Sequence, residues 1–288
     1  MLTSNLGRGS FVLISDKGCG DPLGSVSDTT PRLFLFLKKA EIVCQNRSEP
    51  LQRRALPLHI QRAQRKKMSL KTLTDFILLV DELVLLARKF GVSFDSRGFP
   101  IFKREWFLEQ VPDLLIPYSK RHTKFVHDPM RTALCHYSPD REIYPRLCCL
   151  TNDLPEYHCF LGVVMSDITV TLDMDREWQD FIMLANLLYA AILGANGVKI
   201  IPNLRIGDKV NIENLSCVPH KVIWAAGFLG CEKDKPWDMQ FIYSVVSVGA
   251  NFLLIFGKHD ANAEDKLQVL NIPYKVYPDY HKLCKGGK

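Results

Sequence analysis

From about residue 132 onward, short apolar runs alternate with amphipathic segments of helix length. The runs are apolar at nearly every position, which is typical of strands buried on both faces of a parallel sheet. They are TALCHY, CFLGVVMSD, VKIIPN, KVIWAAG, NFLLIFG and YKVYPD. The helical segments between them are expected at 140–152, 175–196, 209–216, 236–249 and 260–271. This alternation predicts an α/β domain over residues 131–288, a mostly parallel sheet of about six βα units, either open and doubly wound or a partial barrel.

A helical stripe precedes this domain. Between residues 70 and 87, apolar residues recur at the spacing of one helix face, and Gly91 follows as a stop. Turn residues then alternate with basic and aromatic ones. These are Trp106, Lys120, Arg121 and Lys124. Such a mixture can bind single-stranded nucleic acid, although it is more often a packed connector. Residues 68–130 are therefore predicted to be a helical and irregular N-terminal segment.

Residues 1–67 differ from the rest of the chain in charge. They hold 12 Lys and Arg against 5 Asp and Glu, a sum of +7, so the remaining residues carry −1 of the total charge of +6. No strand alternation or helical stripe persists in them, which predicts a disordered basic leader rather than a folded module. The abrupt change at KKMSLKTLTDF raises the further hypothesis that Met68 is the natural start. Any binding of nucleic acid through net charge is expected to involve this leader.

The cysteines and the apolar stretches indicate a cellular compartment. Nine cysteines are scattered without a CxxC pair, and no signal peptide precedes them, which is typical of reduced thiols. The longest apolar stretch, 181–195, is shorter than the ~18 residues of a membrane span, and Asn186 interrupts it. A cytoplasmic protein with no membrane partner is therefore predicted.

Polar residues of interest follow the predicted strands. In parallel α/β folds, ligands bind at the carboxyl ends of the strands, where loops and helix N-termini converge. Pro202 ends one strand, so that Asn203 and Arg205 project from the rim and Gly207 lets the chain turn. Arg205 suits recognition of a phosphate or carboxylate, and Asp167 suits a general base or a metal ligand. The alternative is that these two side chains pair with each other to close the rim.

Two further strand ends carry features that can bind an anion. Gly227 and Gly230 can expose backbone N–H groups to a phosphate, and Lys258 can meet an anion directly. The glycine spacing matches neither the dinucleotide fingerprint nor the P-loop, so plain turn geometry is the alternative.

Thiol, imidazole and metal chemistry have less support. Cys231 lies near a helix start, where a thiolate could be stabilised, and His136 and His259 share its rim as candidate bases. The clustered cysteines and histidines lack the spacing of zinc ligands, so no metal site is predicted. They are Cys135, His136, Cys148, Cys149, His158 and Cys159.

Four motifs recur at the intervals of a known family: GVVMSDITV, NGVKIIPNLRIGD, AAGFLGC and LLIFGK. Through them the stretch from about residue 115 to 283, over half of the chain, resembles domain of unknown function 4417, an uncharacterised family of bacterial and phage proteins. The resemblance implies a role in a phage or mobile element, but no reaction and no cofactor. It supports the importance of Asp167, Asn203, Arg205, Gly227 and Gly230. The basic leader departs from the family pattern.

Two functions of different classes are expected. In the first, the rim binds a phosphate-bearing small molecule or a nucleic-acid end. Arg205, Lys258 and the amides of 227–230 hold the anion, and Asp167 acts as base or metal ligand in a hydrolytic or transfer reaction. In the second, a non-enzymatic module binds nucleic acid or a host protein through the leader and residues 97–124. The sequence leaves the oligomeric state and the cofactor open.

Overall fold

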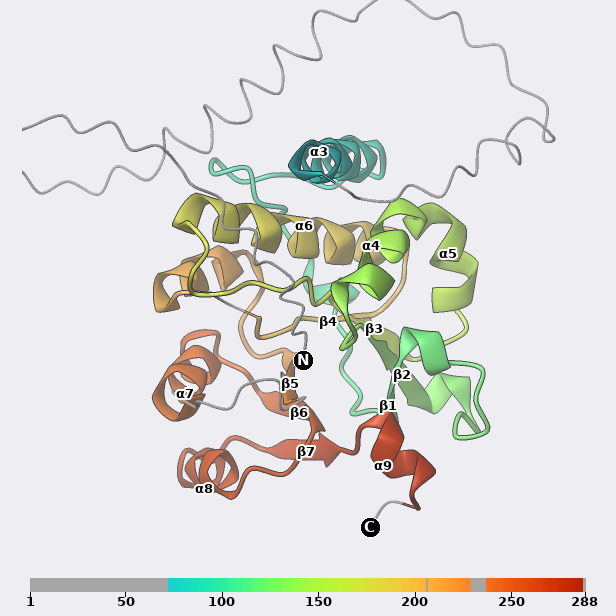
Figure 1. Cartoon of the computed structure of the whole chain (residues 1–288), viewed down its shortest axis with the longest axis vertical. Coiled ribbons are helices and arrows are strands. Elements are labelled where there is room, and N and C mark those ends of the chain that lie inside the picture. Colours follow the sequence, from blue (N-terminus) through green and yellow to red (C-terminus); the bar gives the residue numbers. More distant parts are fainter. Residues whose placement is uncertain (1–71, 206, 229–236, 287–288) are drawn as a thin grey trace, which may run out of the picture.

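The computed structural model describes residues 72–205, 207–228 and 237–286 (Figure 1). The predicted leader lies outside these residues. The described residues form two sheets, one of four strands in the order β1-β2-β3-β4 and one of three in the order β5-β6-β7. The strands are β1 Leu114–Pro117, β2 Thr132–Cys135, β3 Gly162–Val164, β4 Ile200–Ile201, β5 Ile223–Phe228, β6 Phe252–Gly257 and β7 Tyr274–Tyr277. Every neighbouring pair is parallel, which confirms the predicted mostly parallel α/β fold.

The seven strands follow one another in sequence order around a common centre. Two backbone hydrogen bonds join the sheets, from Ala225 N to Pro202 O (2.9 Å) and from Leu204 N to Ala225 O (2.8 Å). At the far edge, Tyr277 Oη on β7 donates to Pro112 O just before β1 (2.6 Å). A doubly wound sheet reverses its strand order at a switch point. Here the strand order runs from β1 to β7 without a reversal. The fold is therefore a partial barrel of parallel strands with its helices outside (Figure 1).

One apolar cluster fills the inside of the barrel. Successive side chains of a strand point to opposite faces, so alternate residues of all seven strands meet there. From the strands these are Leu115, Ala133, Cys135, Val164, Ile201, Ile223, Ala225, Leu254, Phe256 and Tyr277. No helix of the described chain contributes to this cluster. An open sheet covered by helices on both faces would have no such interior.

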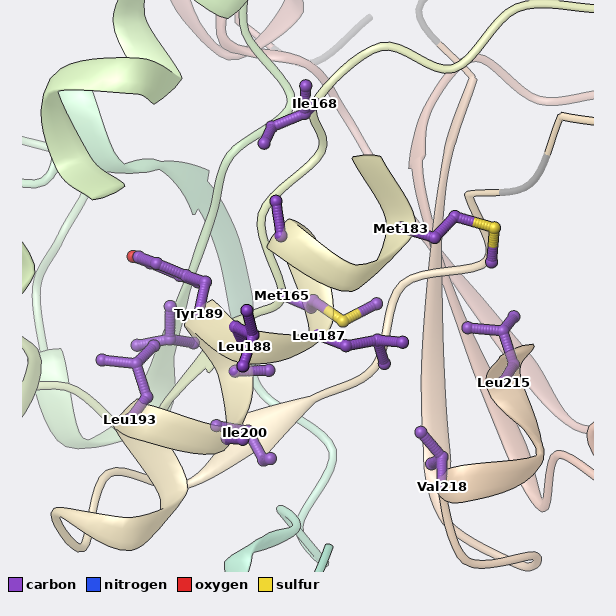
Figure 2. Packing of buried hydrophobic residues seen from close by; sticks show 14 of the residues in the cluster. Met165, Ile168, Met183, Leu187, Leu188, Tyr189, Leu193, Ile200, Leu215 and Val218 are labelled. Carbon is purple, nitrogen blue, oxygen red and sulfur yellow. The ribbon is translucent and has the colours of Figure 1, made fainter. Parts of the chain in front are cut away.

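Helix α6, Arg176–Ala195, forms the main packing layer outside the strands. Its Leu187, Leu188 and Leu193 lie near Met165 and Ile200 (Figure 2). Helix α3, Leu73–Lys89, packs on the other side of α6 as an outer layer (Figure 1). Among the described residues, α6 alone is long and apolar enough to cross a membrane, but 83% of its apolar window is buried inside the protein. It is therefore placed as a core helix.

The other helices largely follow the expected segments. They are α4 Asp140–Cys148, α5 Leu150–Tyr157, α7 Trp237–Ser247, α8 Ala261–Val269 and α9 Tyr280–Cys284. The 3-10 segments are η1 Arg104–Trp106, η2 Tyr118–Lys120, η3 Pro129–Arg131 and η4 Lys209–Cys217. The segment expected as one helix at 140–152 breaks at Cys149 into α4 and α5, and the helix expected at 209–216 is a 3-10 helix.

Strand β1 is one strand more than the sequence pattern predicts. It pairs in register with β2, Leu114 opposite Thr132 and Pro117 opposite Cys135. The sheet therefore extends into the segment before residue 131 that was expected to be helical and irregular. Four residues ending in proline are too short a run to stand out from the surrounding turn residues.

The seam between β7 and β1 can be tested with Tyr277→Phe. The substitution removes the hydroxyl that reaches Pro112 O, and losing one buried hydrogen bond of this kind costs about 0.5–1.5 kcal/mol. We expect urea denaturation to report a loss in the free energy of unfolding of that size. Tyr274→Phe is the control, since it removes a half-buried hydroxyl on the outer face that donates to Glu264 and accepts from Gln268. An equal or larger loss in the control would contradict a stabilising role for the seam.

Candidate functional site

The predicted residues gather at the mouth of the barrel formed by the carboxyl ends of the strands. Asp167 lies three residues after β3, and Asn203 and Arg205 follow β4. Asn203 is bridged to Ala225 of β5, whose Gly227 lies opposite Phe256 of β6. Lys258 is exposed and follows directly after β6. Gly230 and Cys231 lie outside the described residues.

A chain of buried hydrogen bonds runs across this mouth from Tyr137 to Asp167. Tyr137 Oη donates to Asn203 Oδ1 (3.0 Å), and Asn203 Nδ2 donates to Asp167 Oδ1 (2.7 Å). Burial raises the pKa of Tyr137 well above its ordinary value, so the hydroxyl keeps its proton and acts as the donor. The tyrosine therefore fixes the orientation of the amide, and the amide positions the carboxylate.

Arg205 lies beside Asp167 without forming a hydrogen bond to it. The distance from Arg205 Nε to Asp167 Oδ1 is 3.7 Å, within ion-pair range but too long for a hydrogen bond. The side chains of Arg205 and Asp167 are 29% and 12% exposed. Arg205 Nε is nevertheless buried, and it has no hydrogen-bond partner within the described part of the chain. The expected pairing across the rim is therefore present, but it leaves the guanidinium incompletely satisfied.

Burial raises the pKa of the Asp167 carboxyl to about 6. Arg205 and the hydrogen bond from Asn203 act in the opposite direction, and the charge of Asp140 adds to the increase. A carboxyl with a pKa of about 6 is half protonated near pH 6 and still about one-tenth protonated at pH 7. It can accept or release a proton there, as a general base or acid must.

Tyr137 is held in place by a stack and by a glycine. Its ring lies on that of Phe256, with centroids 5.3 Å apart and planes 20° apart. A Cβ at Gly227 would lie 2.6 Å from Cδ1 of Tyr137, so only glycine leaves room for the ring. Packing thus gives Gly227 a role besides the predicted exposure of its amide. No role was predicted for Tyr137. It lies two residues after Cys135, an inward-facing residue of β2, and this spacing indicates that its side chain also faces the barrel interior.

The loop that carries Arg205 is anchored to helices α6 and α7. Gln179 on α6 is buried, and its Oε1 accepts a hydrogen bond from Asp208 N (2.8 Å). Gln240 on α7 donates to Gly207 O (3.0 Å). A Cβ at Gly207 would lie 2.1 Å from Gln179 Oε1, so a larger residue would displace this anchor. These contacts fix the chain directly after the rim residues.

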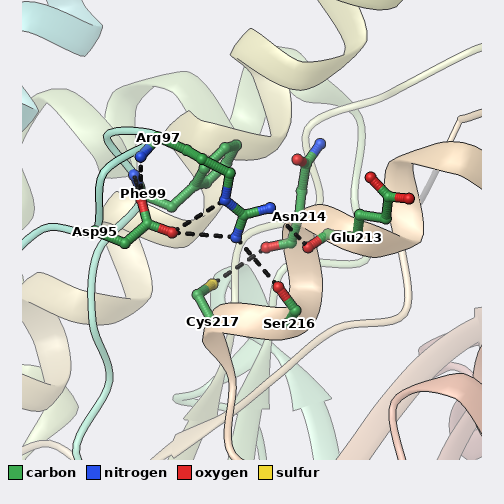
Figure 3. A network of polar contacts seen from close by, with 7 residues as sticks. All are labelled: Asp95, Arg97, Phe99, Glu213, Asn214, Ser216 and Cys217. Atoms are coloured by element: carbon green, nitrogen blue, oxygen red, sulfur yellow. Dashed lines mark hydrogen bonds and ion pairs between the residues drawn. The ribbon is translucent and has the colours of Figure 1, made fainter. Parts of the chain in front are cut away.

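A second anchor holds η4, the segment after that loop. Arg97 donates to Glu213 O (3.2 Å) and to Ser216 Oγ (3.1 Å), and its guanidinium also pairs with Asp95 (3.1 Å) (Figure 3). Asp95 in turn accepts from Phe99 N (2.9 Å). The turn at residues 95–99, far away in sequence, is therefore clamped onto η4.

The imidazole candidates lie outside the Asp167 cluster, and the thiol candidate Cys231 lies outside the described residues. His136 is buried, its Nε2 lies 2.8 Å from Tyr189 Oη on α6, and burial lowers its pKa to about 3. It faces the helix layer as a neutral ring. Burial raises the pKa of the Cys135 thiol, which keeps it protonated. His259 pairs with Glu264 (3.0 Å) on the surface. In the described ranges no group of three or more His, Cys, Asp or Glu side chains is arranged to hold a metal.

Replacing Gly227 by alanine tests the contact with Tyr137. Because the new methyl group would overlap the ring, Gly227→Ala is expected to lower the free energy of unfolding by about 1–3 kcal/mol in urea denaturation. Gly162→Ala on β3 is the control, since its nearest contacts, Lys199 O at 3.1 Å and Leu108 Cδ2 at 3.3 Å, are less severe. A larger loss for Gly162→Ala than for Gly227→Ala would refute the close fit.

The raised pKa of Asp167 predicts a pH dependence of stability. An aspartate with an ordinary pKa of 3.8 when unfolded and about 6 when folded binds protons more tightly in the folded state. Its contribution to stability is therefore full below about pH 4 and is lost as the pH rises through about 6. Asp167→Asn cannot titrate, so the free energy of unfolding of the wild type should fall relative to this variant as the pH rises between those values. A difference that stays constant, or that changes in the other direction, would contradict the raised pKa.

Comparison with known proteins adds no relative. No family model matches the chain, and neither a curated protein nor a solved structure matches it significantly. What the mouth of the barrel does must therefore be inferred from its own geometry.

Proposed function

We propose that the mouth of the barrel binds a phosphate-bearing ligand, either a nucleotide or a nucleic-acid end, and that Asp167 exchanges a proton with it in a hydrolytic or transfer reaction. The observation that supports this most directly is the state of Arg205. Its guanidinium is partly exposed, it lies 3.7 Å from its carboxylate neighbour, and its buried Nε has no hydrogen-bond partner among the described residues. Buried N–H groups are rarely left unpaired, so each exception calls for an explanation such as a catalytic role or an unseen water or ion.

A phosphate satisfies such a guanidinium better than Asp167 does in the free protein. Arginine presents its N–H groups as a planar fork that matches two oxygens of one phosphate. An anion bound there would stand close to the Asp167 carboxylate, and the repulsion would raise the pKa of that carboxyl further above its value of about 6. Binding of the anion would therefore be coupled to uptake of a proton by Asp167. The protonated carboxyl could then donate to a leaving oxygen, and the ionised carboxylate could activate a water.

Neighbouring strand ends supply further groups for the anion. Lys258 follows β6, and β5 separates it from β4, so it stands two strands away from Arg205 along the same mouth. Tyr137 and Asn203 act as positioning residues for Asp167. The amide of Gly227 remains part of the proposal, and the predicted contribution of Gly230 concerns a position outside the described residues.

The family relationship forms part of the same proposal. The four motifs through which the chain resembles domain of unknown function 4417 coincide with strands β3 to β6 and the residues that follow them. These strands carry Asp167, Asn203, Arg205 and Lys258. A binding site at this mouth would give a physical reason why these motifs resemble those of the family. From the same resemblance we propose that the protein originates from a phage or mobile element. The genes that neighbour its coding sequence would test that origin. The non-enzymatic alternative involves the leader, which lies outside the described ranges, and residues 97–124, which lie within them.

The proposal can be tested by thermal-shift screening of the full chain with inorganic phosphate, nucleoside monophosphates and a 5′-phosphorylated dinucleotide. A ligand at 100 times its dissociation constant stabilises a protein by roughly 2.7 kcal/mol, enough for a clear rise in Tm. We expect Arg205→Ala to abolish the rise and Asp167→Asn to retain it while losing turnover. Arg131→Ala is the control, because Arg131 forms a surface pair with Asp113 at the opposite end of β1 and β2. Stabilisation that survives in Arg205→Ala would refute binding at this site.

A further inference from the structure

Two segments far apart in the sequence meet beside the mouth of the barrel. Residues 118–127 follow the carboxyl end of β1, and α9 follows the carboxyl end of β7. The rings of Phe125 and Tyr280 pack edge to face, with centroids 5.9 Å apart at 84°, and Lys120 Nζ lies 5.0 Å from the centroid of Tyr280. Lys124 Nζ lies 5.6 Å from the centroid of Phe125. We call Lys120, Lys124, Phe125 and Tyr280 the basic-aromatic patch.

The surroundings of the patch carry a strong excess of positive charge. Residues 118–127 include Lys120, Arg121 and Lys124 and no acidic residue, and residues 279–286 contribute Lys282 and Lys285 against Asp279. Two acidic residues lie near the patch, and one of them, Glu156, offsets the charge of Arg121. Asp279 accepts from Lys282 N (2.9 Å) at the start of α9, and Glu156 pairs with Arg121 (3.1 Å). In the described part of the chain, no carboxylate forms an ion pair with Lys120 or Lys124.

Lysines alternating with half-buried aromatic rings match the chemistry of single-stranded nucleic acid. The cations can follow the phosphates, and the rings can stack on unpaired bases of any sequence. A duplex would hide its bases from such rings, and reading its grooves requires an element that enters them. An anionic membrane would also attract the lysines, but membranes are anchored by aromatic rings that are free to insert, whereas Phe125 and Tyr280 are partly buried and pack against each other.

We propose that the basic-aromatic patch binds single-stranded nucleic acid and leads the strand toward the mouth of the barrel. This proposal makes the proposed function more specific, because it names the class of ligand. It rests on that function only for the phosphate end that Arg205 would hold. The patch and Arg205 lie at the same end of the barrel, since both follow carboxyl ends of parallel strands. The patch follows β1 and β7 and Arg205 follows β4, so a strand bound at both would have to cross the mouth or follow its rim.

Binding of a fluorescent single-stranded oligonucleotide to the full chain, measured by anisotropy over a range of salt concentrations, tests the patch. Each phosphate contact on a single strand contributes about 0.7 to the slope of log K against log salt. Lys120→Gln/Lys124→Gln is therefore expected to reduce the magnitude of that slope by about 1.4. Tyr280→Leu removes the stacking ring but keeps the charge, so it should weaken binding roughly tenfold at an unchanged slope.

The control variant Lys89→Gln/Lys221→Gln removes two exposed lysines away from the patch, one at the end of α3 and one two residues before β5. All variants retain the basic leader, so its contribution is common to them. Equal losses in the two lysine pairs, absence of binding, or unchanged affinity in Tyr280→Leu would overturn the proposal. Tighter binding to phosphatidylserine vesicles than to the oligonucleotide, with no effect of Tyr280→Leu, would overturn it in favour of a membrane.

The same assay separates the patch from the mouth. We expect Arg205→Ala to weaken binding of a 5′-phosphorylated oligonucleotide and to leave the unphosphorylated one unchanged, whereas the patch variants weaken both. If only the patch variants lose affinity for the oligonucleotides, binding at the patch is supported and the proposed function fails. If only Arg205→Ala loses affinity, binding at the mouth is supported and binding at the patch is overturned.

Discussion

The junction of β4 and β5 at Asn203 is the contact on which both the fold and the candidate site depend. Backbone hydrogen bonds on either side of this residue are the link between the four-stranded and the three-stranded sheet. Its side chain meanwhile connects Tyr137 to Asp167. β4 is only two residues long, so the backbone of Pro202 and Leu204 beyond its end provides the pairing with β5 that a longer strand would give. One residue thereby couples the integrity of the barrel to the geometry of its mouth.

The Asp167 cluster illustrates how such a site can carry a cost in stability. Asp167 is largely buried, and its compensation is incomplete because Arg205 stands too far away for a hydrogen bond. Desolvation therefore dominates over the attraction of Arg205 and the bond from Asn203. Buried groups with incomplete pairing persist where the surrounding structure holds them in place, and they cluster at functional sites. Here the support comes from the stacked Tyr137 ring and from the anchors on the loop after Arg205.

The sequence predicted the elements with strong periodicity and missed the features that depend on contacts between distant residues. The helix at 175–196 and the strands KVIWAAG and NFLLIFG have long, unbroken patterns, and the structure contains them within a few residues. β1 is four residues long and was missed. The choice between open sheet and barrel depends on the approach of Tyr277 to Pro112, which no local pattern encodes. For the same reason the pairing of Asp167 with Arg205 could be expected from the rule on strand ends, whereas the positioning of Asn203 by Tyr137 could not.

The sequential strand order also has a consequence for how the barrel forms and opens. Most strand pairs join neighbours along the chain, so each can form by closing a short segment of polypeptide. The seam is different, because Tyr277 and Pro112 are separated by 165 positions. Closing this long loop costs more chain entropy than closing the shorter segments between neighbouring strands. No backbone hydrogen-bond ladder between β7 and β1 offsets that cost in the described structure. Partial unfolding should therefore begin at this seam, with β7 and α9 detaching as a cooperative unit while the strands that carry Asp167 and Arg205 stay paired.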